Sequence, residues 1–125
     1  MLRGVRGATT AIANEPAAIR AAPRNLLVAL TKANALQPND IAAEIFSSTP
    51  DLNASFPAAA ARELGWTEVP LFGTQEIDCP DGISLYIRVL ILLNTDKSQH
   101  EIQPIYQGGA VVLRPDLNPA EPRRN

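Results

Sequence analysis

Three arginines in this sequence stand in apolar or glycine-rich settings, where a surface charge is not expected. They are Arg6, Arg88 and Arg114, and they are accompanied by Glu76 and Tyr106 in segments predicted to be loops. The planar guanidinium fork binds carboxylates and phosphates through paired hydrogen bonds. A site built from such residues would hold a polyanion and act by position and electrostatics, without covalent or acid–base chemistry.

Arg88 is the most unusual of the three, because it interrupts the most apolar run of the chain, residues 83–93. This run follows the turn signal Pro80-Asp81-Gly82 and is predicted to form a central strand buried on both faces. A guanidinium stays charged at working pH, and leaving it buried without a partner is strongly destabilising. Arg88 therefore needs an anion, which is either a structural carboxylate such as Glu76 or Asp78, or a ligand.

Arg6 and Arg62 each have a structural interpretation as well as a functional one. In the predicted strand 1–10, Arg6 shares a face with Gly4 and Ala8, whose small size leaves room for a recessed ligand-binding side chain. A solvated edge strand is the structural alternative. Arg62 lies near the end of a predicted helix, where a surface arginine interacting with the helix dipole is the simplest interpretation.

Hydrophobic periodicity and turn signals predict one domain in residues 1–117, followed by a mobile tail in residues 118–125. Asn14 is the expected cap of the first helix, and Pro23 is expected to kink it. The expected elements are a strand at 1–10, a helix at 15–35, a strand at 41–47, a short helix at 56–65, a strand at 66–72, the Arg88 strand at 83–93, a short polar helix at 96–105 and a strand at 110–113.

Composition argues against several classes of function. The net charge of −2 does not suit a general nucleic-acid binder. Cys79 and His100 are the single residues of their types, so we expect no zinc site and no intrachain disulfide, in a reducing, cytoplasmic setting. The sequence has no nucleophile elbow and no phosphate-binding loop. It also has no secretory signal and no apolar run long enough for a membrane span.

Seven segments, in order and with similar spacing, together resemble the monofunctional, barrel-type bacterial chorismate mutases. They are LRGVRGATT at 2–10, STPDL at 48–52, FPA at 56–58, RELGW at 62–66, QEID at 75–78, YIRV at 86–89 and AVVLRPDL at 110–117. The resemblance implies a mixed five-stranded α+β sheet with helices packed on one side. Three such chains would assemble into a homotrimer that looks like an α/β barrel, with active sites between neighbouring subunits.

The reaction that the resemblance implies is the Claisen rearrangement of chorismate, a dicarboxylate, to prephenate, on the route to phenylalanine and tyrosine. It is a unimolecular reaction, for which the resemblance implies no cofactor and no metal. Arg88 would hydrogen-bond the ether oxygen, where negative charge grows, and also a carboxylate. Arg6 would bind a carboxylate with Tyr106 beside it, and Glu76 would accept a hydrogen bond from the ring hydroxyl. The further substrate-binding positions would be Phe56, Ala58 and Leu113 around the ring, Arg62 at the cleft mouth, Gly73, Thr74, and Arg114 at the entrance.

Two positions depart from the family pattern. Gly73 stands where family members can carry a cysteine, and Ala59 stands where a lysine can occur, so we expect substrate capture to be affected more than chemistry. The sequence leaves two alternatives, a trimeric enamine/imine deaminase-like protein and a non-catalytic carboxylate-binding trimer of the same topology. The pair of Arg6 with Arg88 and the ending at 113–117 favour the mutase.

Overall fold

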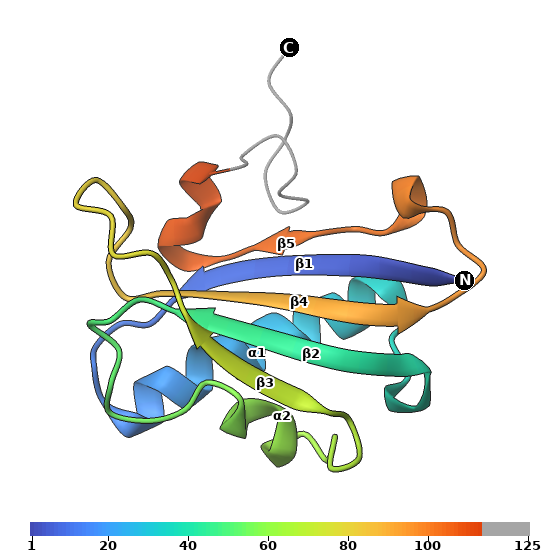
Figure 1. Ribbon diagram of the computed structural model, residues 1–125, viewed down its shortest axis with the longest axis horizontal. Coiled ribbons are helices and arrows are strands. Elements are labelled where there is room, and N and C mark those ends of the chain that lie inside the picture. The colour runs from blue at the N-terminus through green and yellow to red at the C-terminus, as the bar shows by residue number, and fades with distance from the viewer. Residues whose placement is uncertain (114–125) are drawn as a thin grey trace.

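The computed structural model describes residues 1–113, which form a five-stranded sheet with helices on one face (Figure 1). The strands are β1 (Leu2–Thr10), β2 (Ile41–Ser48), β3 (Leu71–Gln75), β4 (Tyr86–Asn94) and β5 (Ile105–Tyr106). The helices are α1 (Pro16–Asn34) and α2 (Ala59–Glu63), with short 3₁₀ helices η1 (Pro38–Asp40), η2 (Gln99–Glu101) and η3 (Gly108–Leu113). Arg114 and the tail predicted at 118–125 lie outside the described residues.

The sheet is mixed, with the strand order β3-β2-β4-β1-β5. β4 is antiparallel to both of its neighbours, β1 and β2, whereas β3 is parallel to β2 and β5 is parallel to β1. The predicted fold class, a mixed five-stranded α+β sheet with helices on one side, is confirmed. The expected Arg88 strand is the central one.

The main core lies between the sheet and α1. One face of β4 buries the aliphatic side chains at alternate positions, because successive residues of a strand point to opposite faces. Leu26 and Leu30 of α1 pack against this face, and Gly7 of β1 allows the close approach. A Cβ atom on Gly7 would lie 2.8 Å from Cδ1 of Leu30, so a larger residue there would push helix and sheet apart. Pro23 is buried within α1, which continues through it as one helix.

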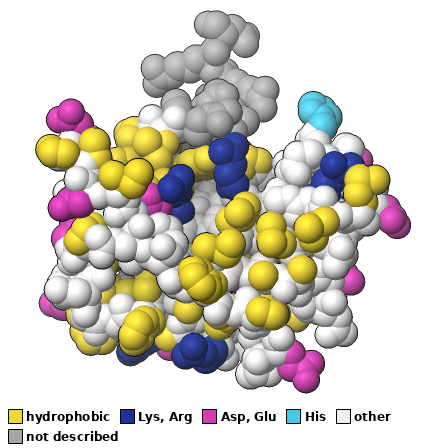
Figure 2. All heavy atoms as spheres, in the orientation of Figure 1, with side chains coloured by type: hydrophobic (Ala, Val, Ile, Leu, Met, Phe, Trp, Pro, Cys, Tyr) yellow, Lys and Arg dark blue, Asp and Glu magenta, His cyan; other side chains and the backbone are white. Residues whose placement is uncertain are grey.

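The expectation that β4 is buried on both faces is wrong for the single chain. On the face opposite the helices, Leu90 and Leu92 are only half-buried, and Arg88 is exposed. Neighbouring strands add Ile45, half-buried, and Phe72, which is 64% exposed, to the same face. Figure 2 looks onto this open face and shows hydrophobic side chains spread across it. Within residues 1–113 only a small cluster of Ala8, Tyr106 and Ala110 packs over one end of this face, so the apolar side chains on this side of β4 are not fully buried.

Several element boundaries also differ from the prediction. The strand expected at 66–72 begins only at Leu71, because Pro70 has no N–H group to donate and instead its carbonyl oxygen accepts the N–H of Glu44 at 2.9 Å. The residue at the N-cap of α1 is Glu15. Asn14 accepts hydrogen bonds from the backbone of the 53–54 segment instead.

The last part of the described chain is less regular than predicted. The helix expected at 96–105 is reduced to η2, where Ser98 forms the predicted cap together with Glu101. The strand expected at 110–113 is the 3₁₀ helix η3, because the chain turns at Gly108, whose φ is +55°. The fifth strand is instead β5, which pairs with Gly7 and Ala8 of β1.

Glu44 is an unusual member of the core. It lies on the helix side of β2, its side chain is fully buried, and neither carboxylate oxygen has a hydrogen-bond partner within residues 1–113. Burial without a compensating partner disfavours the charged form. It raises the pKa of the Glu44 carboxyl from 4.5 to about 8.

This shift predicts that Glu44 lowers stability as the pH rises. Between pH 4.5 and about 8 the folded chain retains a proton that the unfolded chain has released. The free energy of unfolding should therefore fall by about 1.4 kcal/mol per pH unit in this range. Glu44→Met replaces the carboxyl with an apolar group of similar length and should be more stable at pH 8 and lack this slope.

The measurement is urea unfolding of both proteins at several pH values. Glu68→Met is the matched control, because Glu68 is exposed in the adjoining loop and its replacement should change stability by only about 0.5 kcal/mol or less. A Glu44→Met protein less stable than the parent at pH 8 would contradict the assignment.

Candidate active site

One row of residues crosses all five strands on the open face of the sheet. Arg88 of β4 stands opposite Ser47 of β2 on one side and opposite Ala8 of β1 on the other. Beyond these, Thr74 pairs with Ser47, and Tyr106 pairs with Ala8. Because both immediate neighbours of Arg88 are small, its side chain has free space above the sheet.

A cavity of about 630 Å³ lies over this row. Six of the predicted site residues line it, namely Arg6, Thr74, Glu76, Arg88, Tyr106 and Leu113. They come from four strands, from the residue that follows β3, and from η3. The structure therefore brings the four predicted catalytic residues into one hollow, with apolar side chains such as Leu90 in its wall.

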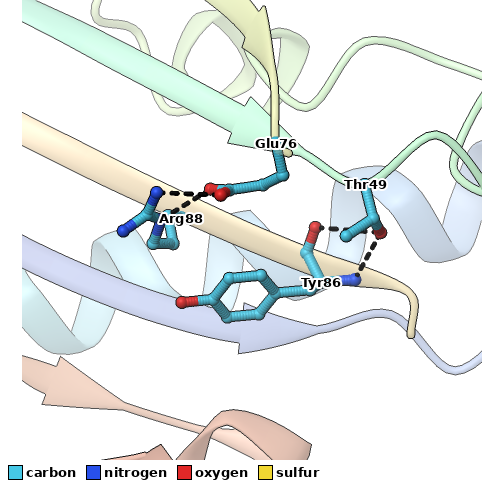
Figure 3. A network of polar contacts seen from close by, with 4 residues as sticks. All are labelled: Thr49, Glu76, Tyr86 and Arg88. Atoms are coloured by element: carbon cyan, nitrogen blue, oxygen red, sulfur yellow. Dashed lines mark hydrogen bonds and ion pairs between the residues drawn. The ribbon is translucent and has the colours of Figure 1, made fainter. Parts of the chain in front are cut away.

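Arg88 and Glu76 form a bidentate ion pair at the centre of this cavity (Figure 3). The Nε atom donates to one carboxylate oxygen at 2.5 Å, and Nη2 donates to the other at 2.8 Å. The hydrogen bond to Glu76 raises the pKa of Arg88 above its usual value, so the guanidinium is a permanent cation. Glu76 directly follows β3, and it is held in place by β2, because its N–H donates to the carbonyl of Ser48 at 2.9 Å. Of the two carboxylates considered from the sequence, Glu76 is the partner.

This ion pair leaves part of the guanidinium available. The side chain of Arg88 is 57% exposed, whereas that of Glu76 is 11% exposed. Nη1 makes no hydrogen bond within residues 1–113, so it can donate to a ligand. An ion pair with an exposed partner contributes little to stability. The arrangement is therefore better suited to holding a cation in position than to stabilising the fold.

Residues from the first strand and from the last described segments form other parts of the wall of this cavity. Arg6 lies on the open face of β1, diagonal to Arg88, with Leu90 opposite it. Tyr106 of β5 is 7% exposed. Leu113 is carried by η3, which is fastened to β1 by a 2.8 Å hydrogen bond from the N–H of Gly109 to the hydroxyl of Thr10.

The other predicted site residues lie in a second hollow, of about 560 Å³. Phe56, Ala58, Arg62 and Gly73 line it, and Thr74 is shared with the first cavity. Phe46 and Gly73 face the helix side of the sheet, while Ser47 and Thr74 face the open side. The two hollows thus lie on opposite faces at the β3 edge, and one chain does not combine the two sets of residues. Arg114 lies outside the described residues.

The residues of the first cavity that the sequence analysis missed include Ser47 and Tyr86. The signal for Tyr86 was the alternation of the strand, because a residue two places before Arg88 points to the same face. Ser47 could not be found this way without the register between β2 and β4. Within the described part of the chain no group of three or more His, Cys, Asp or Glu side chains could hold a metal ion. No helix there is long and apolar enough to cross a membrane.

Fold and site together define a small α+β protein whose open sheet face carries a cavity with two arginines and, among its described lining residues, no Cys or His. The sequence matches the family chorismate mutase type I over residues 2–117. It is 44% identical to the chorismate mutase AroH of Thermus thermophilus, over 97% of this chain and 100% of that protein. It is 42% identical to the chorismate mutase AroH of Bacillus subtilis, over 94% of each chain.

A solved structure has the same fold. A chorismate mutase from Clostridium thermocellum superposes with a TM-score of 0.85 and 42% sequence identity, covering 87% of this chain and 97% of that one. The chain belongs to the chorismate mutase type I family. The resemblance seen in the seven sequence segments is thereby confirmed, and the deaminase-like alternative is set aside. The protein is an isomerase of aromatic amino-acid biosynthesis.

Proposed function

We propose that this chorismate mutase rearranges chorismate to prephenate in a site shared by two subunits, with Arg88 as the central cation. The observation that carries the proposal is the gathering of Arg6, Glu76, Arg88 and Tyr106 in one cavity on the open face of the sheet. The site offers fixed charges and hydrogen-bonding groups, which suit a reaction that needs neither a nucleophile nor a cofactor.

The chemistry follows from the positions of these groups. Arg88 donates to the ether oxygen, where negative charge grows as the C–O bond breaks, and to a carboxylate. Arg6 binds a carboxylate beside Tyr106, and Glu76 accepts a hydrogen bond from the ring hydroxyl. An acceleration of about 10⁶ requires roughly 8 kcal/mol. A fixed cation at the developing oxyanion can supply about 3–4 kcal/mol, and holding the folded conformer of the substrate can supply much of the remainder.

Assembly into a homotrimer is part of the proposal, and two features support it. The open face carries apolar side chains that no layer within residues 1–113 covers, namely Leu2, Ala43, Ile45, Phe72, Leu90 and Leu92. The second hollow, with Phe56, Ala58, Arg62 and Gly73, lies on the other face of the β3 edge. A neighbouring copy that docks on the open face would bring its own second hollow to the Arg88 cavity.

The departures from the family pattern fall in the second hollow or next to it. Gly73 has no atoms within 4 Å of where its Cβ would be, so the contact of a cysteine side chain is replaced by open space or backbone there. Ala59 makes the same side of the cleft less positive. Arg114 is proposed to close the entrance, and residues 1–117 to act as one catalytic domain. An exposed free thiol, Cys79, suits the reducing cytoplasm, which we propose as the location.

The first test is turnover of chorismate. Adding the purified protein should speed the loss of chorismate absorbance far above the spontaneous rate. Prephenate is then confirmed by its conversion to phenylpyruvate in acid. A rate equal to the spontaneous rate would refute the proposed function.

The role of Arg88 is tested by Arg88→Lys, which keeps the charge but loses the planar fork. We expect kcat to fall by about 10²–10³ while size-exclusion chromatography shows an unchanged assembly. Arg24→Lys is the control, because Arg24 is exposed on α1 and should leave kcat unchanged. If Arg88→Lys dissociates or misfolds but retains activity per folded site, Arg88 is structural.

The shared site is tested by mixing two impaired variants, Arg88→Ala and Arg62→Ala. Each homotrimer should have low activity. After joint refolding, about a quarter of the sites should combine an intact Arg88 with an intact Arg62 from the neighbouring chain, because association is random and each site is heterologous. Activity of the mixture no higher than the mean of the two variants would show that each site is built within one chain.

A further inference from the structure

Tyr86 lines the same cavity as the four proposed catalytic residues but has no assigned role. It is the first residue of β4 and lies on the open face, two positions before Arg88 and opposite Thr10 of β1. Figure 3 shows its ring extending beside Arg88. Tyr86 also lines a neighbouring hollow of about 530 Å³, as do Arg88 and Glu76, so these three side chains lie where the two hollows meet.

The backbone N–H and C=O groups of Tyr86 both form hydrogen bonds with Thr49, which belongs to the STPDL segment (Figure 3). The N–H of Tyr86 donates to the hydroxyl of Thr49 at 2.9 Å, and the N–H of Thr49 donates to the carbonyl of Tyr86 at 3.0 Å. The preceding residue, Leu85, has a φ of +53°, and its N–H donates to a carboxylate oxygen of Asp51 at 2.9 Å. These bonds fix where β4 begins, and therefore the point from which the Tyr86 ring projects.

The phenol of Tyr86 is suited to donate a hydrogen bond. Its side chain is half-buried, and desolvation raises its pKa to about 12, with Glu76 and Tyr106 adding to the rise and Arg88 opposing it. The hydroxyl is therefore neutral and protonated throughout the range in which the enzyme would be assayed. It has no hydrogen-bond partner within residues 1–113, although charged groups surround it.

We infer that the hydroxyl of Tyr86 donates a hydrogen bond to the substrate carboxylate that Arg88 holds. This inference rests on the proposed function. A carboxylate can accept several hydrogen bonds at once, and a neutral donor beside a cation adds one without adding charge. Tyr86 and Arg88 lie on the same face of β4 and line the same two hollows, so a carboxylate bound by Arg88 there lies in the surroundings of Tyr86 as well.

Such a contact has a defined kinetic signature. The carboxylate carries its full charge in the substrate and in the transition state, so the hydrogen bond is present in both. An interaction of equal strength in the two states lowers KM and leaves kcat unchanged. Tyr86 is then a substrate-binding residue that acts on affinity, whereas Arg88 acts on the chemical step.

The test is Tyr86→Phe, which removes the hydroxyl and keeps the ring. We expect KM for chorismate to rise about tenfold, with kcat within about twofold of the parent, as for the loss of a hydrogen bond to a charged group. The matched control is Thr67→Val, which removes an exposed hydroxyl in the loop before β3, away from the cavity, and should leave both constants unchanged. Circular dichroism and size-exclusion chromatography check that both variants fold and assemble.

A second measurement separates this inference from the proposed function. Calorimetric titration with prephenate, which retains two carboxylates, should give about tenfold weaker binding to Tyr86→Phe than to the parent. Equal KM and equal prephenate affinity in the two proteins would overturn the inference. A lower kcat with unchanged KM would also overturn it, because the contact would then belong to the transition state. A parent that binds prephenate but does not turn over chorismate would refute the proposed function alone, and the titration would still decide the role of Tyr86.

Discussion

A guanidinium that cannot lose its charge lies at the middle of an otherwise apolar strand, and much of the structure accommodates this one group. The helix side of β4 is packed into the core, so the strand cannot rotate to expose a different face. On the open side, the neighbours of Arg88 are small, and Glu76 supplies a carboxylate within the chain. The charge is thus fixed in position by apolar packing beneath it and by the carboxylate of Glu76 beside it.

The bidentate pair with Glu76 reconciles the structural and functional interpretations of Arg88. Without a ligand, Glu76 balances the charge of Arg88, although the pair adds little to stability because the guanidinium is exposed. The same carboxylate is proposed to contact the ring hydroxyl of the substrate, so it serves both states. Since Arg88 remains largely exposed and Nη1 is free within the described chain, the pair does not have to break completely for a ligand to bind.

Local sequence was sufficient to predict the elements that have a long hydrophobic pattern. The nineteen-residue helix α1 and the central strand were found from periodicity, and the mixed sheet followed from family resemblance. Local sequence did not predict the correct element where tertiary contacts determine the structure. β3 starts after Pro70 because pairing with β2 needs N–H groups, and the segment at 110–113 becomes 3₁₀ helix because Gly108 turns the chain against Thr10. Periodicity also could not reveal that one face of β4 is open, because an apolar face has the same composition whether it packs in a core or, as we propose here, against another subunit.

The candidate site, like the fold, could be predicted only in part from the sequence. The residue types of Arg6, Arg88 and Glu76 indicated anion binding, but that they meet depends on the register of three strand pairs. Tyr86 illustrates the converse, because its place in the cavity followed from simple alternation with Arg88 and was overlooked. The STPDL segment contributes through Thr49 and Asp51, which hold the start of β4 and do not line the Arg88 cavity.

The two hollows on opposite faces at the β3 edge differ in how they are built. The cavity that contains Arg6 and Arg88 is lined mainly by strand residues, and the core packing holds these strands in place. The hollow around Phe56 and Arg62 is formed largely by the 49–58 loop, with further residues from β2, from β3 and from the end of α2. Under the proposed assembly, charge recognition is therefore placed on the strands of one chain and ring recognition largely on a loop of another. Such a division lets substitutions in the loop retune which ring fits, while the electrostatic machinery of the neighbouring subunit is inherited unchanged.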